Sequence, residues 1–246
     1  MILLKRNLLI IGILTLILNL LITFPAKVAF NFLDTTDVYF NEIEGSLWKG
    51  SAKNISYGKF YLNEMHWDIN VIEIFKGALS YNIKAKPQSG SFKAKFNFKF
   101  NGTMFISKLA SSLPLSIFSS VTGIPGLKGR VILNFDQLKI LDGVPFTADG
   151  KINITDLVIP LVGSDQLGNY ELSFITQEKN VLAKINDTEG IVNFNGTLKI
   201  ENNRSFEILG MISPKPETPT FIRQQLLFLP AANKQGQQEL RLEGIL

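Results

Sequence analysis

The 246-residue chain contains no cysteine. Disulfide bonds, cysteine-based zinc sites, thiol nucleophiles and cysteine-ligated iron–sulfur clusters are therefore excluded together. The chain has a single histidine, His66, so a histidine-rich metal site is impossible and any catalytic triad of the usual type would have to use this residue. His66 stands between Met65 and Trp67 on the opposite phase of an alternating pattern, which predicts a strand histidine that faces solvent.

Charged residues are also scarce, at 19% of the chain against 46% hydrophobic residues. This composition is too apolar for a disordered protein and is sufficient to build a sizeable core. The net charge is only +4, and Lys5 and Arg6 at the N-terminus contribute part of it. A broad basic face is not expected, so we predict no nucleic-acid partner.

No motif in the sequence indicates catalysis. Asp142, Asp149, Asp165 and Asp187 stand beside Gly, Ser or Thr, where hydrogen bonds from the side chain to the backbone of turns explain them. Residues 123–129 are rich in glycine but lack the spacing of a phosphate-binding loop. We predict that the protein is not an enzyme and has no catalytic, cofactor-binding or metal-binding residues; an envelope hydrolase using His66 or a carboxylate pair is the least favoured alternative.

The N-terminus contains the longest apolar run of the chain. Residues 8–24 carry no charge and follow the pair Lys5-Arg6. A run of this length is at the short end of what spans a bilayer core, and the preceding charges predict a cytoplasmic N-terminus. A cleaved signal peptide is the alternative, but the run is slightly long and residues 24–29 offer no clean small-x-small cleavage site. We therefore predict a cytoplasmic tail and transmembrane anchor over residues 1–25, with residues 26–246 outside the cytoplasm.

From about residue 38 onward, apolar and polar residues alternate, which predicts half-buried strands. The clearest case is residues 91–100, where an apolar phase opposes a lysine-rich phase. The apolar phase holds Phe92, Ala94, Phe96, Phe98 and Phe100, and the polar phase holds Ser91, Lys93, Lys95, Asn97 and Lys99. We expect a mainly β protein: an N-terminal transmembrane helix followed by an extended, curved antiparallel sheet with two or three short helices.

Local signals predict where the strands are interrupted. Glycine-containing pairs predict turns at residues 101–102, 142–143, 149–150, 189–190 and 195–196. Shifts of the apolar phase at residues 136–137 and 155–156 predict bulges. Short helices are predicted over residues 70–76, over residues 107–120 with a kink at Pro114, and over residues 219–229 with Thr218 as the N-cap.

One cluster stands apart from the alternating strands. Gly45, Leu47, Trp48, Gly50 and Ala52 lie close together where the alternation begins. Two glycines that enclose a Leu-Trp pair predict a hairpin edge, with Trp48 covering the core.

With these five residues, the sequence resembles the type II secretion system protein N family, in which a Gly-x-Leu-Trp-x-Gly-x-Ala motif follows a short N-terminal anchor. Further similarities are Trp67 before a short helix-like piece, a glycine–strand–turn pattern over residues 127–150, and a Leu-rich helix, Gly236 and a final strand at the end. The resemblance implies a bitopic protein of the inner membrane with a periplasmic β-rich domain, associated with other secretion-system membrane proteins. It implies a structural role for the five motif residues and no catalysis or cofactor.

Two functions remain open at this point. The first is a non-enzymatic component of the secretion assembly that contacts its partners through a sheet edge or the lysine-rich phase. The second is a membrane-anchored periplasmic lipid-binding or lipid-transfer protein, in which Phe92, Phe96, Phe98 and Phe100 line an apolar groove. Periodicity does not separate these two functions, because a lipid groove and a closed core share one pattern.

Overall fold

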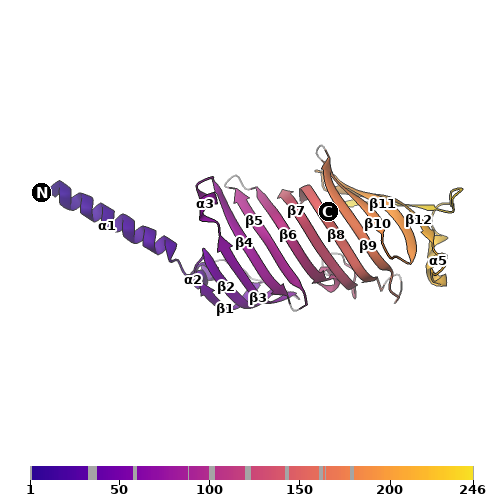
Figure 1. Cartoon of the computed structure of the whole chain (residues 1–246), viewed down its shortest axis with the longest axis horizontal. Helices are drawn as coiled ribbons and strands as arrows, with labels where there is room; N and C mark the ends of the chain where they lie inside the picture. Colours follow the sequence, from indigo (N-terminus) through magenta and orange to yellow (C-terminus); the bar gives the residue numbers. More distant parts are fainter. Residues whose placement is uncertain are drawn as a thin grey trace.

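The computed structural model describes residues 2–32, 38–57, 60–87, 89–99, 103–119, 123–141, 144–160, 163, 165–177 and 180–245. In these residues thirteen strands form one antiparallel sheet, ordered as in the sequence from β1 at one edge to β13 at the other (Figure 1). The predicted mainly β, antiparallel fold is confirmed. The strands are β1 (Val38–Gly45), β2 (Lys49–Tyr57), β3 (Phe60–Ile69), β4 (Ala78–Pro87), β5 (Ser91–Lys99), β6 (Met104–Pro114), β7 (Lys128–Leu141), β8 (Val144–Val158), β9 (Gly168–Gln177), β10 (Asn180–Asp187), β11 (Val192–Ile200), β12 (Ser205–Pro214) and β13 (Gln238–Ile245).

In the described residues a long and a short helix precede this sheet, and further short helices follow β3, β6 and β12. They are α1 (Ile2–Ile22), α2 (Ala26–Phe32), α3 (Val71–Ile74), the 3-10 helix η1 (Leu115–Phe118) and α5 (Thr220–Leu226). α1 projects away from the sheet beyond β1, and its side chains are described from Asn7 onward (Figure 1). Among the described residues no helix combines the length and the apolar character that crossing a membrane requires.

The register separates the side chains of the sheet into two faces. Trp67, Ile83 and Ala94 form one row across β3, β4 and β5, while His66, Lys84 and Lys93 form the neighbouring row. Because successive side chains of a strand point to opposite sides, these rows belong to opposite faces. We call them the apolar face and the lysine face.

The core lies on the apolar face, and the sheet curves around it. Strands two apart in a flat sheet would be about 9.5 Å apart, yet Cα atoms of β8 and β10 approach within 8 Å of one another. This bend lets side chains from β5 to β11 pack together, as Phe135 and Phe174 do with ring centroids 5.4 Å apart. The buried members of this cluster are Ala94, Ile106, Leu109, Phe135, Val144, Ala148, Phe174, Val181, Ala183 and Ile200.

The prediction of a helix over residues 107–120 is wrong. The segment forms most of β6, and only Leu115–Phe118 adopts a short 3-10 turn. Leu109 and Leu113 are four residues apart, a spacing that fits two strand periods as well as one helical turn, and both are buried in the sheet. Pro114 ends the strand rather than kinking a helix.

Two of the predicted turns are also wrong, because residues 149–150 lie inside β8 and residues 195–196 inside β11. At Gly150 a Cβ would clash with the Asn134 carbonyl oxygen and lie 2.7 Å from the Phe135 ring, and at Gly196 it would lie 2.9 Å from both the Leu209 carbonyl oxygen and the Phe194 ring. Both glycines therefore allow the close approach of a neighbouring backbone and an aromatic ring, a known use of glycine within strands.

The other local predictions have mixed outcomes. The turn at residues 189–190 and the bulges near residues 136–137 and 155–156 are confirmed, and turns 101–102 and 142–143 lie outside the described residues. The helix at residues 70–76 is present as the shorter α3, with the Asn70 side chain accepting a hydrogen bond from the Ile72 amide at 3.2 Å.

Thr218 does not cap α5, because Pro219 occupies the N-cap position. Instead the Thr218 hydroxyl accepts a hydrogen bond from the Lys215 amide at 2.6 Å and donates one to the Ile191 carbonyl. The connector before α5 is thereby attached to the turn between β10 and β11.

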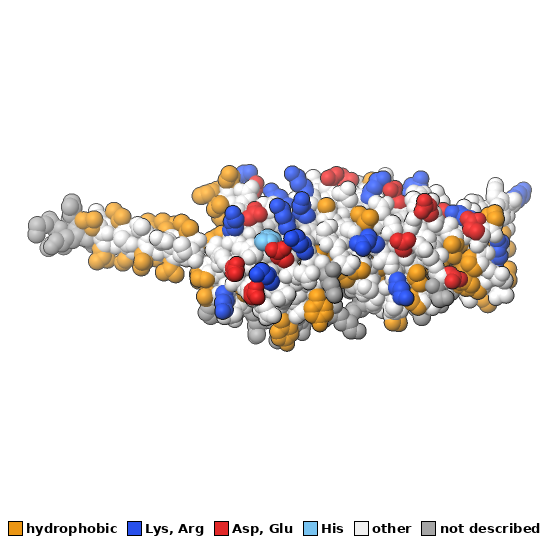
Figure 2. Space-filling view, turned by 60° about the horizontal axis from the view of Figure 1, so that its bottom comes forward, with side chains coloured by type: hydrophobic (Ala, Val, Ile, Leu, Met, Phe, Trp, Pro, Cys, Tyr) orange, Lys and Arg blue, Asp and Glu red, His pale blue; other side chains and the backbone are white. Residues whose placement is uncertain are grey.

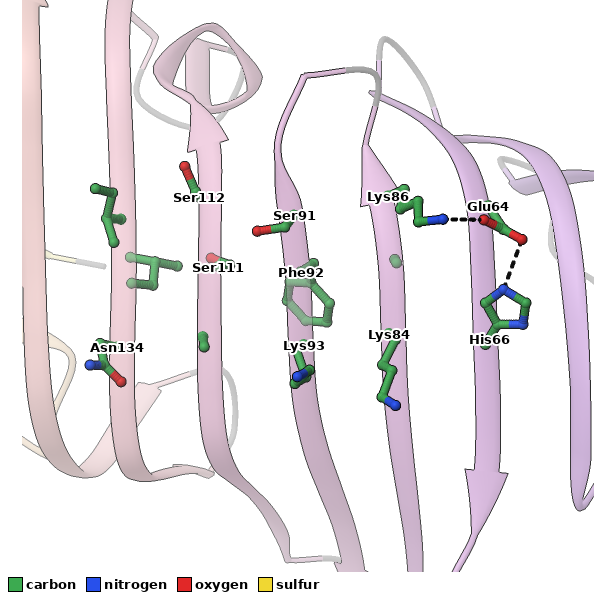
Figure 3. Close-up of a pocket in the computed structure, with 14 residues that line it drawn as sticks. Glu64, His66, Lys84, Lys86, Ser91, Phe92, Lys93, Ser111, Ser112 and Asn134 are labelled. Atoms are coloured by element: carbon green, nitrogen blue, oxygen red, sulfur yellow. Dashed lines mark hydrogen bonds and ion pairs between the residues drawn. The ribbon is translucent and has the colours of Figure 1, made fainter.

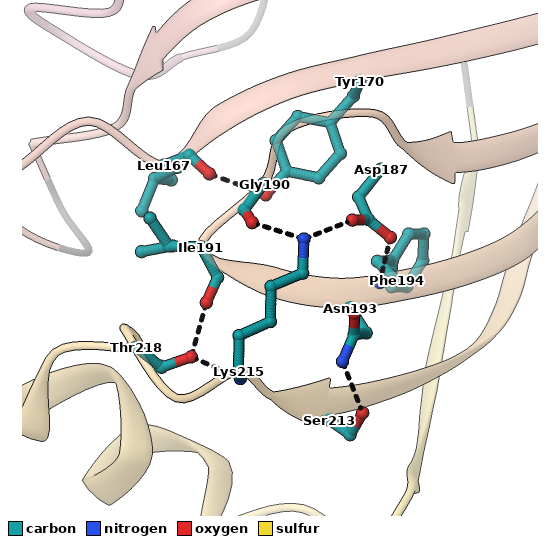
Figure 4. Close-up of polar contacts among 10 residues, drawn as sticks. All are labelled: Leu167, Tyr170, Asp187, Gly190, Ile191, Asn193, Phe194, Ser213, Lys215 and Thr218. Atoms are coloured by element: carbon teal, nitrogen blue, oxygen red, sulfur yellow. Dashed lines mark hydrogen bonds and ion pairs between the residues drawn. The ribbon is translucent and has the colours of Figure 1, made fainter.

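An ion pair strengthens this attachment (Figure 4). Lys215 Nζ lies 2.7 Å from Asp187 Oδ2 and donates to the Gly190 carbonyl at 2.7 Å, with both charged side chains less than one-fifth exposed. Asp187 Oδ1 accepts a further hydrogen bond from the Phe194 amide at 2.8 Å. Burial, with a smaller contribution from the charge of Asp187, raises the pKa of the neighbouring Tyr170 to about 12.

We predict that Lys215→Met lowers the free energy of unfolding by about 3 kcal/mol, because it leaves a largely buried carboxylate without its cation. Urea denaturation followed by circular dichroism measures the change. Lys199→Met is the matched control: it removes an exposed pair with Glu201, and a far smaller change is expected. A loss for Lys215→Met no larger than for this control would contradict the role of the pair.

Candidate functional site

The motif residues form the turn between β1 and β2 and the start of β2. Gly45 and Gly50 pair across the two strands, and the Ser46 amide donates to the Lys49 carbonyl at 2.9 Å to close the turn. Gly45 has a φ of +87°, and a Cβ there would lie 2.5 Å from the Lys49 carbonyl oxygen. The turn therefore requires glycine at this position.

The second glycine makes room for a buried tryptophan. A Cβ at Gly50 would lie 2.5 Å from Cζ2 of Trp67 and 2.5 Å from the Glu44 carbonyl oxygen. The Trp67 ring is 5% exposed, and its Nε1–H donates to the Ser46 carbonyl at 3.2 Å. Trp67, rather than Trp48 as expected, therefore covers the core at this end of the sheet.

Trp48 and Leu47 instead bind the end of α1. The Nε1–H of Trp48 donates to the Leu21 carbonyl at 2.6 Å, and the Leu47 amide donates to the Phe24 carbonyl at 2.9 Å. The last carbonyls of a helix have no partner within the helix itself. The Trp48 hydrogen bond therefore satisfies a carbonyl in the last turn of α1, and the Leu47 hydrogen bond holds Phe24, two residues beyond the helix.

The chain following α1 packs directly on the motif. Pro25 forms a β-bridge with Ser46, and the next residue, Ala26, is 0% exposed. Ala26 belongs to one buried cluster with Ala52, Ile55 and Trp67, in which Ala52 is also 0% exposed. We call this assembly the helix joint; it comprises Leu21, Phe24, Pro25, Ala26, Gly45, Ser46, Leu47, Trp48, Gly50, Ala52 and Trp67.

A second feature lies on the lysine face, where a groove of about 570 Å³ crosses β3 to β7 (Figure 3). We call it the lysine groove. Its side chains on this face are Glu64, His66, Lys84, Lys86, Ser91, Lys93, Ala110, Ser112, Ile132 and Asn134.

Charges in the lysine groove are only partly balanced. Glu64 lies 2.9 Å from Lys86 Nζ and 2.8 Å from His66 Nε2. The hydrogen bonds from Lys86 and then His66 hold the pKa of Glu64 below its usual range. Lys84 and Lys93 stand directly opposite each other, and neither forms an ion pair within the described part of the chain.

The predicted phenylalanine stripe lies on the apolar face. Phe92 and Phe96 pack against the main core cluster with their ring centroids 6.3 Å apart, whereas Phe98 is 41% exposed. Phe100 lies outside the described residues. On the opposite phase, Lys93 is exposed and Lys95 is half-buried.

His66, the histidine considered for catalysis, lies on the opposite face of the sheet from its neighbour Trp67 in the helix joint. His66 has a 53% exposed side chain at the rim of the lysine groove, next to Glu64. Across the described ranges, no three His, Asp or Glu side chains come close enough to hold a metal ion. The lysine groove itself was not predicted, although Asn82, Lys84 and Lys86 form a polar phase that the sequence displays.

These features define a single-sheet β protein bound to an N-terminal helix through a Gly-x-Leu-Trp-x-Gly-x-Ala turn. The family described as type II secretion system (T2SS), protein N, matches residues 37–241, and the chain belongs to this family. The predicted resemblance is confirmed, and membership indicates a component of the type II secretion system.

Two curated relatives have nearly the same length. The type II secretion system protein N of Aeromonas hydrophila is 24% identical over 236 residues, which cover 92% of each chain. The protein of the same name from Vibrio cholerae serotype O1 is 23% identical over 239 residues, which cover 93% of each chain. No solved structure gives a significant match to the chain.

We predict that Trp48→Phe loosens the helix joint and leaves the sheet intact, because it removes one hydrogen-bond donor and keeps an aromatic ring. Losing this hydrogen bond should cost about 1 kcal/mol of stability at the helix end and so speed amide exchange over residues 22–26 about fivefold. Hydrogen-exchange mass spectrometry measures this change. Trp67→Phe is the control and should lower the thermal unfolding midpoint of the sheet. Unchanged exchange over residues 22–26 in Trp48→Phe would show that the Leu21 hydrogen bond does not hold the helix end.

Proposed function

We propose that this protein is a non-enzymatic component of the type II secretion system of a Gram-negative envelope, aiding protein export across the outer membrane. Residues 1–25 are a cytoplasmic tail and a single transmembrane anchor in the cell inner membrane. Residues 26–246 are a periplasmic β-rich domain. Its partners are the inner membrane and other membrane proteins of the secretion system.

The helix joint is the observation that carries this proposal. It attaches an apolar helix to a large sheet through backbone hydrogen bonds and a buried cluster that includes Ala26, Ala52 and Trp67. A joint of this kind holds the domain in a fixed position relative to its anchor. The motif that forms it is the part of the chain with the most distinctive resemblance to the family.

The side chains of α1 support the assignment as an anchor. Apolar side chains surround the helix and make little contact with the sheet (Figure 2). Each is 49–66% exposed: Leu8, Leu9, Ile10, Ile11, Ile13, Leu14, Leu16, Ile17, Leu18, Leu20, Leu21 and Ile22. A soluble protein rarely leaves so large an apolar surface uncovered, so an apolar environment around α1 explains it.

The lipid-handling alternative is not favoured. Both curated relatives are named as secretion-system proteins. Phe92 and Phe96, two of the residues that would line a lipid groove, pack against the core cluster.

Single-cysteine labelling tests the topology directly, because the native chain has no cysteine to interfere. We predict that a membrane-impermeant maleimide labels Lys184→Cys, at the exposed position of β10, in cells with a permeabilised outer membrane. Ile2→Cys should be labelled only after the inner membrane is broken. Labelling of Lys184→Cys only after inner-membrane lysis would exclude a periplasmic sheet.

A secretion assay tests the function separately. A strain without this protein should retain exported proteins in the periplasm, and the wild-type chain should restore their release. Normal export in the deletion strain would contradict the proposed function, whatever the labelling shows.

A further inference from the structure

The lysine groove contains a pair of like charges that forms no ion pair with any described residue. Lys84 and Lys93 are exposed, stand directly opposite each other on β4 and β5, and have no ion-pair partner in the described segments. Arg130, next to the groove, adds a further positive charge and donates to the Ser112 hydroxyl at 3.1 Å. Like charges directly opposite each other destabilise a sheet, so this arrangement opposes folding slightly.

Several other cations of the lysine face pair with a glutamate on a neighbouring strand. Outside the groove such pairs join Lys53 to Glu42 at 2.9 Å, Lys151 to Glu171 at 3.2 Å and Arg241 to Glu207 at 3.0 Å, and within the groove Lys86 pairs with Glu64 at 2.9 Å. Figure 2 shows blue side chains gathered beside the single histidine on this face. Two like charges that directly oppose each other, with no gain in stability for the chain, are typical of a binding site.

The shape of the groove suits an extended chain. It crosses five strands, a length of about 19 Å at the usual spacing, which accommodates about six extended residues. The small side chain of Ala110 leaves a hollow in the row between Lys93 and Asn134, and Ile132, 37% exposed, offers an apolar contact. Ser91 and Asn134 supply exposed hydrogen-bonding groups along the groove.

The position of the groove favours a protein over lipid head groups, an argument that rests on the proposed membrane anchoring. The groove is centred near β5, about 19 Å from β1 along the direction in which strands follow one another. α1 leaves the sheet in the opposite direction, beyond β1 (Figure 1). The head-group layer of a bilayer is only about 5–8 Å thick on each side, so it would end before the groove.

We infer that the lysine groove binds an extended, acidic segment of a partner protein, in which carboxylates alternate with other residues. Because alternate side chains of an extended segment point to the same side, the carboxylates all face the groove and pair with Lys84 and Lys93.

The probe is a fluorescent eight-residue peptide of alternating Glu and Val, added to the full chain in mild detergent and followed by anisotropy. The peptide should bind at low ionic strength and bind at least tenfold more weakly in 0.5 M salt, because the contacts are charged and exposed. A peptide of alternating Lys and Val serves as the matched control and should not bind.

The decisive variant is Lys84→Glu, which replaces a repulsive pair by an attractive one with Lys93. It should weaken peptide binding at least tenfold without lowering the thermal unfolding midpoint, which separates loss of binding from loss of folding. Lys184→Glu on β10 changes an exposed lysine of the same face outside the groove and should leave binding unchanged.

Three results would overturn the inference: no binding of the Glu–Val peptide, equal binding by Lys84→Glu, or equal binding of the Lys–Val peptide. Displacement of the peptide by an equal concentration of glycerophosphoglycerol would identify a lipid head-group site instead, and would also overturn it. The assay uses purified protein and has no secretion readout. Its failure therefore leaves the proposed function standing, and failure of the secretion or labelling tests is recognised independently.

Discussion

Burial of one apolar face of a single sheet is the constraint on which the rest of the structure depends. Thirteen strands in the described residues form one layer, so no second sheet covers that face. In the middle of the sheet, curvature brings β5 to β11 together around their own side chains. Short helices complete the burial elsewhere: Ala26 of α2, Leu115 of η1 and Ile222 of α5 each belong to a separate buried cluster. These three helices are therefore local covers for the sheet.

The helix joint follows from the same constraint. α2 covers β1 to β3, where Phe30 approaches the Trp67 ring edge-on at 5.7 Å, and this packing fixes the chain just after α1. The hydrogen bonds to Leu21 and Phe24 are accepted by backbone carbonyls. Their geometry depends on where α1 ends and does not depend on its side chains. The joint therefore places no constraint on the side chains of α1, which need only form an apolar surface.

Sequence reasoning succeeded where the pattern is repeated many times and failed where it is ambiguous. The strand alternation and the phase shifts near residues 136–137 and 155–156 identified the sheet and its bulges. The helix prediction based on Leu109 and Leu113 is wrong because a spacing of four residues fits both a strand and a helix. The turn predictions at Gly150 and Gly196 are wrong because the sequence does not distinguish a glycine that allows close packing within a sheet from a glycine in a turn.

The candidate sites show more clearly what the sequence pattern leaves undetermined. The motif identified the residues of the helix joint, but only the pairing of Gly50 with Trp67 reveals which tryptophan is buried and which binds α1. Lys84 and Lys93 lie nine positions apart in sequence, and their opposition is fixed by the register of β4 and β5. Such a property belongs to the pairing of strands, which periodicity along one strand does not specify.

The helix joint and the lysine groove use polar groups in opposite ways, and the sheet connects them. In the joint, the indole N–H of Trp48 and the amide of Leu47 are satisfied within the chain. In the groove, the ammonium groups of Lys84 and Lys93 repel one another. Continuous strand pairing from β2 to β5 holds the two features at a fixed separation. A contact made at the groove is therefore held in a defined position relative to α1 by the hydrogen-bonded sheet, without a flexible linker between them.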